Sequence, residues 1–127
     1  MKLHRDVPTG QNMFSGYGPG YVSVNGTRHE RSIVVLPDRL IVDWAPQGVE
    51  ALEAVHLVPL AELDLEVLLL GTGEKLRVPK SDVLRPITNA RIGLEVMDVP
   101  AAARTYNILL AEGRRVAAAL LLGRASP

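Results

Sequence analysis

Residues 68–79, LLLGTGEKLRVP, combine types and spacing that could bind a phosphate. An apolar run ends in Gly71-Thr72-Gly73, and glycine-rich loops after buried strands often hold phosphates with their backbone amides. A dinucleotide-binding loop needs a third glycine, but Leu76 stands at that position. A P-loop needs Gly-Lys-Ser/Thr, and this loop continues with Gly-Glu-Lys. We therefore predict a tight turn whose glycines allow positive φ or close backbone approach, and no cofactor.

A ligand cleft without a nucleotide motif remains an alternative for this loop. Gly71-Thr72-Gly73 follows one expected strand and Asp98 follows another. The carboxyl ends of parallel strands are the usual ligand position in open α/β sheets. Thr72, Asp98 and neighbouring amides could therefore share a cleft for a small molecule or anion. The full hypothetical cleft contains Gly71, Thr72, Gly73, Glu95, Asp98, Tyr106 and Asn107.

The segment after Asp98 is expected to be a helix with two polar or aromatic residues in its middle. Tyr106 and Asn107 both lower helix propensity. This cost indicates a packing or hydrogen-bonding role, in which Tyr106 anchors the helix and its hydroxyl finds a partner. Three arginines could form a basic edge for an anionic partner, or a solvated face balanced by a nearby glutamate. These arginines are Arg104, Arg114 and Arg115.

Other catalytic chemistry finds little support. The absence of cysteine excludes thiolate nucleophiles, disulfides and cysteine-bound metals. His4, His29 and His56 lack metal-ligand spacing, so we predict no metal site. A triad of Ser32, His29 and Asp38 can be drawn, but no Gly-x-Ser-x-Gly sequence surrounds any serine. We predict no catalytic residue.

The first third of the chain predicts an antiparallel meander of about four strands. Glycine and proline separate β-rich runs, and Asn25-Gly26 is a strong type I′ turn signal because both positions favour positive φ. The expected strands are Met13–Tyr17, Tyr21–Val24, Arg28–Leu36 and Leu40–Asp43.

The remainder predicts alternating strands and helices. A regular helix should begin near Val58 with Pro59 in its first turn, and another should run from a Ser81 cap through Ala90. A third should run from an Asp98 cap to about Glu112 and stop at Gly113. Expected strands are Val67–Leu70, Gly93–Met97, Val116–Leu122 and a small one at Leu76–Val78. This alternation implies parallel pairing with helices packed on the sheet.

Composition narrows the class of protein. The chain has 127 residues, 47% of them hydrophobic, which fits one domain over residues 1–127 with a loosely ordered arm at 1–12. Fourteen basic and fourteen acidic residues give zero formal net charge, so no nucleic-acid partner is expected. No signal peptide and no apolar run of roughly 20 residues is present, so we expect a soluble cytoplasmic protein without membrane insertion. A homo-oligomer is possible.

Several short strings, in this order, carry a resemblance to a known family. They are YVSVNG at 21–26, RS at 31–32 ahead of an apolar strand, LPD at 36–38, Trp44, LGTG at 70–73, GLEVMD at 93–98, TYN at 105–107 and EGRRVA at 112–117. The chain resembles a domain-of-unknown-function family of small bacterial and archaeal proteins. Its eukaryotic relatives include a mitochondrial assembly factor for respiratory complex I and an adipogenesis-associated protein.

The resemblance implies a three-layer α/β fold with a central mixed sheet and an added β-hairpin layer. It implies no established catalytic residues and points to protein partners, including components of respiratory-complex assembly. The leading expectation is a non-enzymatic interaction domain. The alternative is a small-molecule or anion binder, with cryptic enzyme activity as one form, that uses the Gly71–Gly73 loop and Asp98.

Overall fold

The computed structural model describes residues 10–123, which contain two β-sheets and three α-helices. The expected arm at 1–12 lies mostly outside the described residues. The strands are β1 (Phe14–Gly18), β2 (Tyr21–Val24), β3 (Thr27–His29), β4 (Ile33–Leu36), β5 (Arg39–Val42), β6 (Val67–Gly71), β7 (Gly93–Met97) and β8 (Val116–Leu120). The helices are α1 (Ala54–Ala61), α2 (Ser81–Asn89) and α3 (Val99–Ala111), with a short 3-10 helix at Val49–Ala51.

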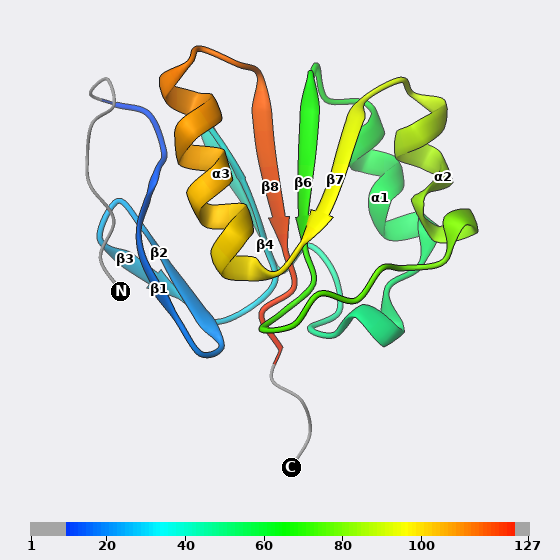
Figure 1. Ribbon diagram of the computed structural model, residues 1–127, viewed down its shortest axis with the longest axis horizontal. Helices are drawn as coiled ribbons and strands as arrows, with labels where there is room; N and C mark the ends of the chain where they lie inside the picture. The colour runs from blue at the N-terminus through cyan, green and yellow to red at the C-terminus, as the bar shows by residue number, and fades with distance from the viewer. Residues whose placement is uncertain (1–9, 124–127) are drawn as a thin grey trace.

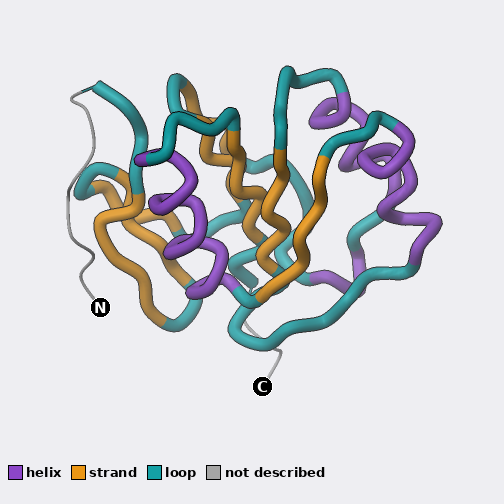
Figure 2. The backbone as a smooth tube through the Cα atoms, turned by 45° about the horizontal axis from the view of Figure 1, so that its top comes forward, coloured by secondary structure: helices purple, strands orange, loops and turns teal. Residues whose placement is uncertain are grey.

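A five-stranded mixed sheet of order β5-β4-β8-β6-β7 forms the middle of the molecule (Figure 1). Helix α3 and the three-stranded sheet β1-β2-β3 cover one face, and α1 and α2 cover the other (Figure 2). Strands β4, β6 and β8 are buried along their whole length, as expected when both faces of a sheet are covered. The predicted three-layer α/β fold with a central mixed sheet is confirmed.

Alternate residues of the central strands supply two apolar cores. Leu69 and Ala118 point into the core shared with α3 and the small sheet, whereas Leu68 and Ala117 point into the core beneath α1 and α2. Strand β6 pairs in parallel with both β7 and β8, as the strand–helix alternation predicted. On the α3 side, the small Ala118 side chain of β8 leaves room for α3 to pack closely on the sheet.

The predicted N-terminal meander is divided between the two sheets, so the single strand expected at Arg28–Leu36 was wrong. Strand β3 pairs with β2, but β4 pairs with β5 and β8 in the central sheet. Ser32 lies at the break, where its hydroxyl donates to the Ala45 carbonyl and its amide donates to Gln47 Oε1 at 2.6 Å. These bonds replace ladder bonds and redirect the chain. The turn between β2 and β3 is as predicted, with φ of 50° at Asn25 and 86° at Gly26.

The helix boundaries also differ from the predictions. Helix α1 begins at Ala54 and not near Val58, because Glu53 and His56 form a reciprocal cap in which the Glu53 amide donates to His56 Nδ1 at 2.9 Å. Helix α2 begins at Ser81, one residue after the Lys80 cap, and ends at Asn89. No strand forms at Leu76–Val78. Asp98 caps α3 as predicted, and Gly113 follows its end with φ of 77°.

Candidate functional site

The Gly71–Gly73 turn joins the carboxyl end of β6 to an irregular loop. A Cβ atom on Gly71 would lie 2.7 Å from Leu120 Cδ2 and 3.3 Å from the Val99 Cα. The start of α3 therefore packs directly on this glycine. Gly73 has φ of 114°, a conformation that residues with side chains rarely adopt. Both glycines have the backbone roles that the sequence predicted for them.

The Thr72 hydroxyl organises the loop that follows. It donates to the Lys75 carbonyl at 2.8 Å and accepts the Arg77 amide at 2.9 Å. The Thr72 side chain is buried, and these bonds hold Lys75 and Arg77 beside the Gly71–Gly73 turn. The hydroxyl is thus engaged by its own loop.

The first turn of α3 closes against the same loop. The Val99 amide donates to the Gly73 carbonyl at 2.8 Å, and the Thr72 amide donates to the Met97 carbonyl at 2.9 Å. Asp98 Oδ1 accepts the Ala101 amide at 2.8 Å. A helix N-terminus does meet the glycine loop, but it belongs to a later segment and its amides are already bonded. The first-turn amides of α3 are therefore not free to bind a phosphate at this loop.

A cleft of about 370 Å³ opens beside this loop, at the carboxyl ends of β6 and β8. Apolar side chains dominate its walls, and the Glu74 side chain supplies the charged group. Gly73 borders the cleft, whereas Thr72 and Asp98 do not. Its lining is Tyr17, Gly18, Pro19, Gly20, Tyr21, Gly73, Glu74, Val99, Pro100, Leu121, Leu122 and Gly123.

Two arginines fix the tyrosines of the cleft. Arg104 Nη1 donates to the Tyr17 hydroxyl at 2.8 Å, and its guanidinium carbon lies 5.8 Å from the centre of that ring. The Arg28 guanidinium carbon lies 3.8 Å from the centre of the Tyr21 ring, within cation–π distance. The cleft is therefore a largely apolar hollow with a carboxylate at one side, and arginines contact both of its tyrosines.

Tyr106 and Asn107 lie away from this cleft, at the contact between α3 and β1. Tyr106 is fully buried, its hydroxyl donates to the Asn12 carbonyl at 2.8 Å, and its ring packs edge-on against Phe14 with centroids 5.2 Å apart. Burial raises the pKa of the Tyr106 hydroxyl above its usual range, and the negative charge of Asp38 adds to the shift. The expectation of a helix anchor therefore agrees with its surroundings.

Asn107 binds the backbone of β1 at two points. Its Oδ1 accepts the Phe14 amide at 2.9 Å, and its Nδ2 donates to the Phe14 carbonyl at 2.8 Å. The carboxamide thereby takes the place that a neighbouring strand would occupy along β1. Asn107 completes the edge of the small sheet.

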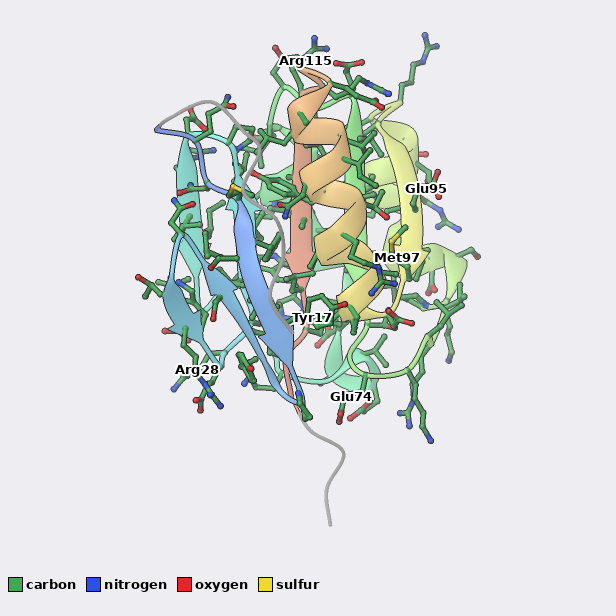
Figure 3. All side chains as sticks on the ribbon, turned by 60° about the vertical axis from the view of Figure 1, so that its left-hand side comes forward. Tyr17, Arg28, Glu74, Glu95, Met97 and Arg115 are labelled. Atoms are coloured by element: carbon green, nitrogen blue, oxygen red, sulfur yellow. The ribbon has the colours of Figure 1, made fainter. Side chains whose placement is uncertain are left out.

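The expected basic edge is divided, because Arg104 lies apart from Arg114 and Arg115. Arg104 contacts Tyr17 at the cleft, whereas Arg115 lies at the opposite end of the molecule (Figure 3). There Arg114 Nε contacts Glu66 Oε2 at 3.1 Å, and Arg115 Nε lies 3.6 Å from Asp64 Oδ1. The Arg115 amide and the two guanidinium groups lower the pKa of Glu66. Glutamate and aspartate therefore neutralise this end, beside a second cavity of about 520 Å³.

The remaining candidates do not form a reactive cluster. Glu95 is exposed on β7 and has no ion-pair partner within residues 10–123. The Ser32 hydroxyl is bonded to the Ala45 backbone and not to His29. No group of three metal-binding side chains occurs in the part of the chain that the structure describes. In that same part, no helix is long and apolar enough to cross a membrane.

Sequence reasoning missed most of the cleft-lining residues. Tyr17 and Tyr21 flank the Gly-Pro-Gly turn between β1 and β2, and that turn brings both rings to the start of α3. The sequence feature that marks the cleft is the pair of tyrosines, one on each side of this turn. It pointed to a cleft only once the small sheet was placed against α3.

Comparison with known proteins assigns the family. Residues 14–121 match the family described as "Protein of unknown function (DUF498/DUF598)". The chain is 32% identical over 121 residues to "NADH dehydrogenase [ubiquinone] 1 alpha subcomplex assembly factor 3" of Danio rerio, covering 94% of this chain and 68% of that protein. The corresponding Bos taurus protein is also 32% identical, and the chain covers 65% of its length.

Solved structures support the same assignment. A crystal structure from Bordetella parapertussis matches with a TM-score of 0.83 and 40% identity, covering 91% of this chain and 98% of that one. The solution structure of a Bordetella pertussis protein, described as an Mth938-like domain, matches with a TM-score of 0.77 and 37% identity, covering 96% and 92%. The chain therefore belongs to the DUF498/DUF598 family of proteins and has an Mth938-like fold.

Proposed function

We propose that the chain is a cytoplasmic, non-enzymatic protein-interaction domain that acts in the assembly of a respiratory complex. The observation that carries the proposal is that the polar side chains best suited to chemistry are hydrogen-bonded within the fold. Thr72, Asp98 and Asn107 all bond to the backbone of their own chain. A catalytic site instead needs polar groups free to act on a substrate. The assembly-factor names of several relatives support the same reading.

Exposed apolar side chains supply further support. Leu76 and Val78 are 55% and 68% exposed on the loop after Gly73, and Ile108 is 58% exposed on α3. Leu76 and Val78 lie two residues apart on one loop, and apolar side chains grouped on a surface are typical of sites that bind other proteins. The proposal does not depend on which of these patches is used.

Affinity purification from native lysate of a source cell tests the proposal. The tagged chain is expected to recover respiratory-complex subunits or assembly proteins in stoichiometric amount, whereas an unrelated tagged domain of similar size is not. Quantitative mass spectrometry provides the readout. Recovery of no respiratory component under gentle detergent extraction would contradict the proposal.

A second candidate function is small-molecule binding in the cleft beside Gly73. The cleft favours it because apolar walls with a single carboxylate, from Glu74, suit an apolar ligand that carries an amine. A thermal-shift screen of metabolites tests it, because a ligand at 100 times its dissociation constant adds about 2.7 kcal/mol of stability. Chemical-shift changes at Gly73 and Leu122 would locate the ligand. Changes confined to other regions would exclude this cleft.

A further inference from the structure

Strand β7 ends the central sheet with an open backbone edge. It pairs with β6 alone, as the strand order shows. The Gly93 amide donates to the Glu66 carbonyl at 3.0 Å, and the Met97 carbonyl accepts the Thr72 amide at 2.9 Å. Successive residues of a strand direct their backbone groups to opposite sides. Gly93, Glu95 and Met97 therefore face β6, whereas Leu94 and Val96 present their N–H and C=O groups to the free side.

No strand within residues 10–123 pairs with that free side. The backbone groups of Leu94 and Val96 make no hydrogen bond there. The strand is partly exposed along its length, unlike the wholly buried β6. It contains no proline and no bulge, the common devices that protect an edge from further pairing.

The contrast with β1 shows that this openness is specific to β7. The Asn107 carboxamide binds both backbone groups of Phe14 and closes β1 where it faces α3. No side chain does the same for β7 in the described chain. The same fold thus caps one edge beside α3 and leaves the other able to pair.

The side chains of β7 restrict what can pair there. Leu94 and Val96 pack towards the core beneath α1 and α2, and Met97 packs towards the core beneath α3. Glu95 projects on the same face as Met97 and is exposed, with no ion-pair partner among the described residues (Figure 3). A strand added at this edge would place one of its own side chains directly opposite the Glu95 carboxylate.

Charge argues against a second copy as the occupant. A two-fold antiparallel pairing that joins Leu94 to Val96 of the other copy would put the two Glu95 carboxylates opposite each other. Like charges in directly opposed positions destabilise a strand pair. A basic side chain at that position would instead form a favourable cross-strand pair. Self-pairing in this register is therefore disfavoured, and the open edge with Glu95 favours a partner segment that carries a basic side chain.

We infer that β7 binds an extended segment of a partner protein as a sixth strand of the central sheet, with a Lys or Arg of that segment opposite Glu95. This inference rests on the proposed function, because it names the surface and the partner chemistry of the interaction domain. Backbone hydrogen bonds to Leu94 and Val96 supply the affinity, and the charge at Glu95 supplies the selectivity. Apolar side chains on either side of the basic residue project on the face of Leu94 and Val96 and extend the core beneath α1 and α2.

An NMR titration with two capped peptides tests the inference on the whole chain. The probes are Thr-Val-Lys-Val-Thr and the same sequence with Glu in place of Lys, both at millimolar concentration. The Lys peptide is expected to slow hydrogen exchange of the Leu94 and Val96 amides and to bind about two- to tenfold more tightly than the Glu peptide. No slowing at either amide, or changes centred on another element, would overturn the inference.

Charge reversal provides the matched control. Glu95→Lys is expected to reverse the peptide preference, whereas Glu62→Lys, which makes the same change of charge on an exposed residue at the end of α1, should leave it intact. An unaltered preference in Glu95→Lys would overturn the role of that carboxylate. The Leu94 and Val96 amides could also become more protected from hydrogen exchange as the protein concentration rises without peptide. That result would overturn the inference, because it would show that two copies pair at this edge.

A second variant separates this inference from the proposed function. Val96→Pro removes an outward N–H without removing a bond to β6, and should abolish peptide binding. If wild type recovers assembly components from lysate and Val96→Pro recovers them equally, the inference fails and the proposed function stands. If wild type recovers none while the Lys peptide protects both amides, the proposed function fails and the edge assignment stands.

Discussion

Strands β1 and β7 lie at the ends of their sheets, yet the chain treats the two edges differently. Beside β1, Asn107 pairs with the Phe14 backbone and Tyr106 packs against the Phe14 ring. Beside β7, the backbone of Leu94 and Val96 has no partner among residues 10–123. The difference shows which of the two edges the polar side chains of α3 protect. Asn107 and Tyr106 join α3 to β1 and the chain before it, whereas β7 keeps its outer backbone open in the described chain.

The largest expected effect is at the closed edge. Asn107→Ala leaves the N–H and C=O of Phe14 without partners, and each unsatisfied buried group costs about 1–3 kcal/mol. We expect the free energy of unfolding to fall by about 2–4 kcal/mol, measured by urea denaturation. Thr105→Ala, on the same helix but without such bonds, is the control and should change stability little. Equal losses in both variants would contradict the role assigned to Asn107.

The turn at the end of β6 should be the next most sensitive position. Gly71→Ala places a methyl group 2.7 Å from Leu120 Cδ2 and within 3.3 Å of the Val99 backbone. Overpacking of this kind costs about 1–3 kcal/mol. The crystal structure of the variant should show α3 displaced from β6 at its first turn. A stability equal to wild type would mean that the close approach of α3 is not required.

Tyr106 should make the stability of the closed edge depend on pH. Its raised pKa means that folding favours the protonated hydroxyl, so its contribution is complete below the unfolded pKa of about 10 and is lost as pH rises above that value. Tyr106→Phe should lose about 1 kcal/mol at neutral pH with the hydrogen bond to Asn12. Denaturation series from pH 8 to 11 should show a smaller alkaline decline in the variant than in wild type. If the stability of both proteins falls equally with pH, groups other than Tyr106 cause the alkaline loss.

The open edge should tolerate substitutions that the closed edge does not. Val96→Pro removes no bond to β6, so we expect its cost to stay below about 1 kcal/mol. Glu95→Pro removes an N–H that faces β6 and should cost about 1–3 kcal/mol. Thermal and urea denaturation of this neighbouring pair measures the difference. Equal losses of stability in the two variants would show that the Glu95 and Val96 N–H groups do not face opposite sides, one towards β6 and the other away from it.

Local sequence signals predicted much of the fold because they depend on near neighbours. The Asn25-Gly26 turn, the Asp98 cap and the stop at Gly113 each follow from backbone geometry within a few residues. The buried strand before Gly71 was visible as an unbroken apolar run. Parallel pairing then followed from the alternation of strands and helices.

The features that could not be predicted from the sequence depend on contacts between residues far apart in the chain. The break at Ser32 depends on Ala45 and Gln47, which no local pattern connects to it. The partner of the Asn107 side chain is Phe14, 93 residues away in sequence. The cleft depends on the packing of the β1–β2 turn against α3. Polar residues therefore marked important positions without showing whether they served a ligand or the fold.

Residue-resolved hydrogen exchange of the free protein tests the central comparison most directly. The account predicts strong protection of the Phe14 amide, bound by Asn107, together with fast exchange of the Leu94 and Val96 amides beside slowly exchanging Glu95 and Met97. Equal, strong protection of all four β7 amides in the monomer would contradict an open edge. A rapidly exchanging Phe14 amide would contradict the closed one.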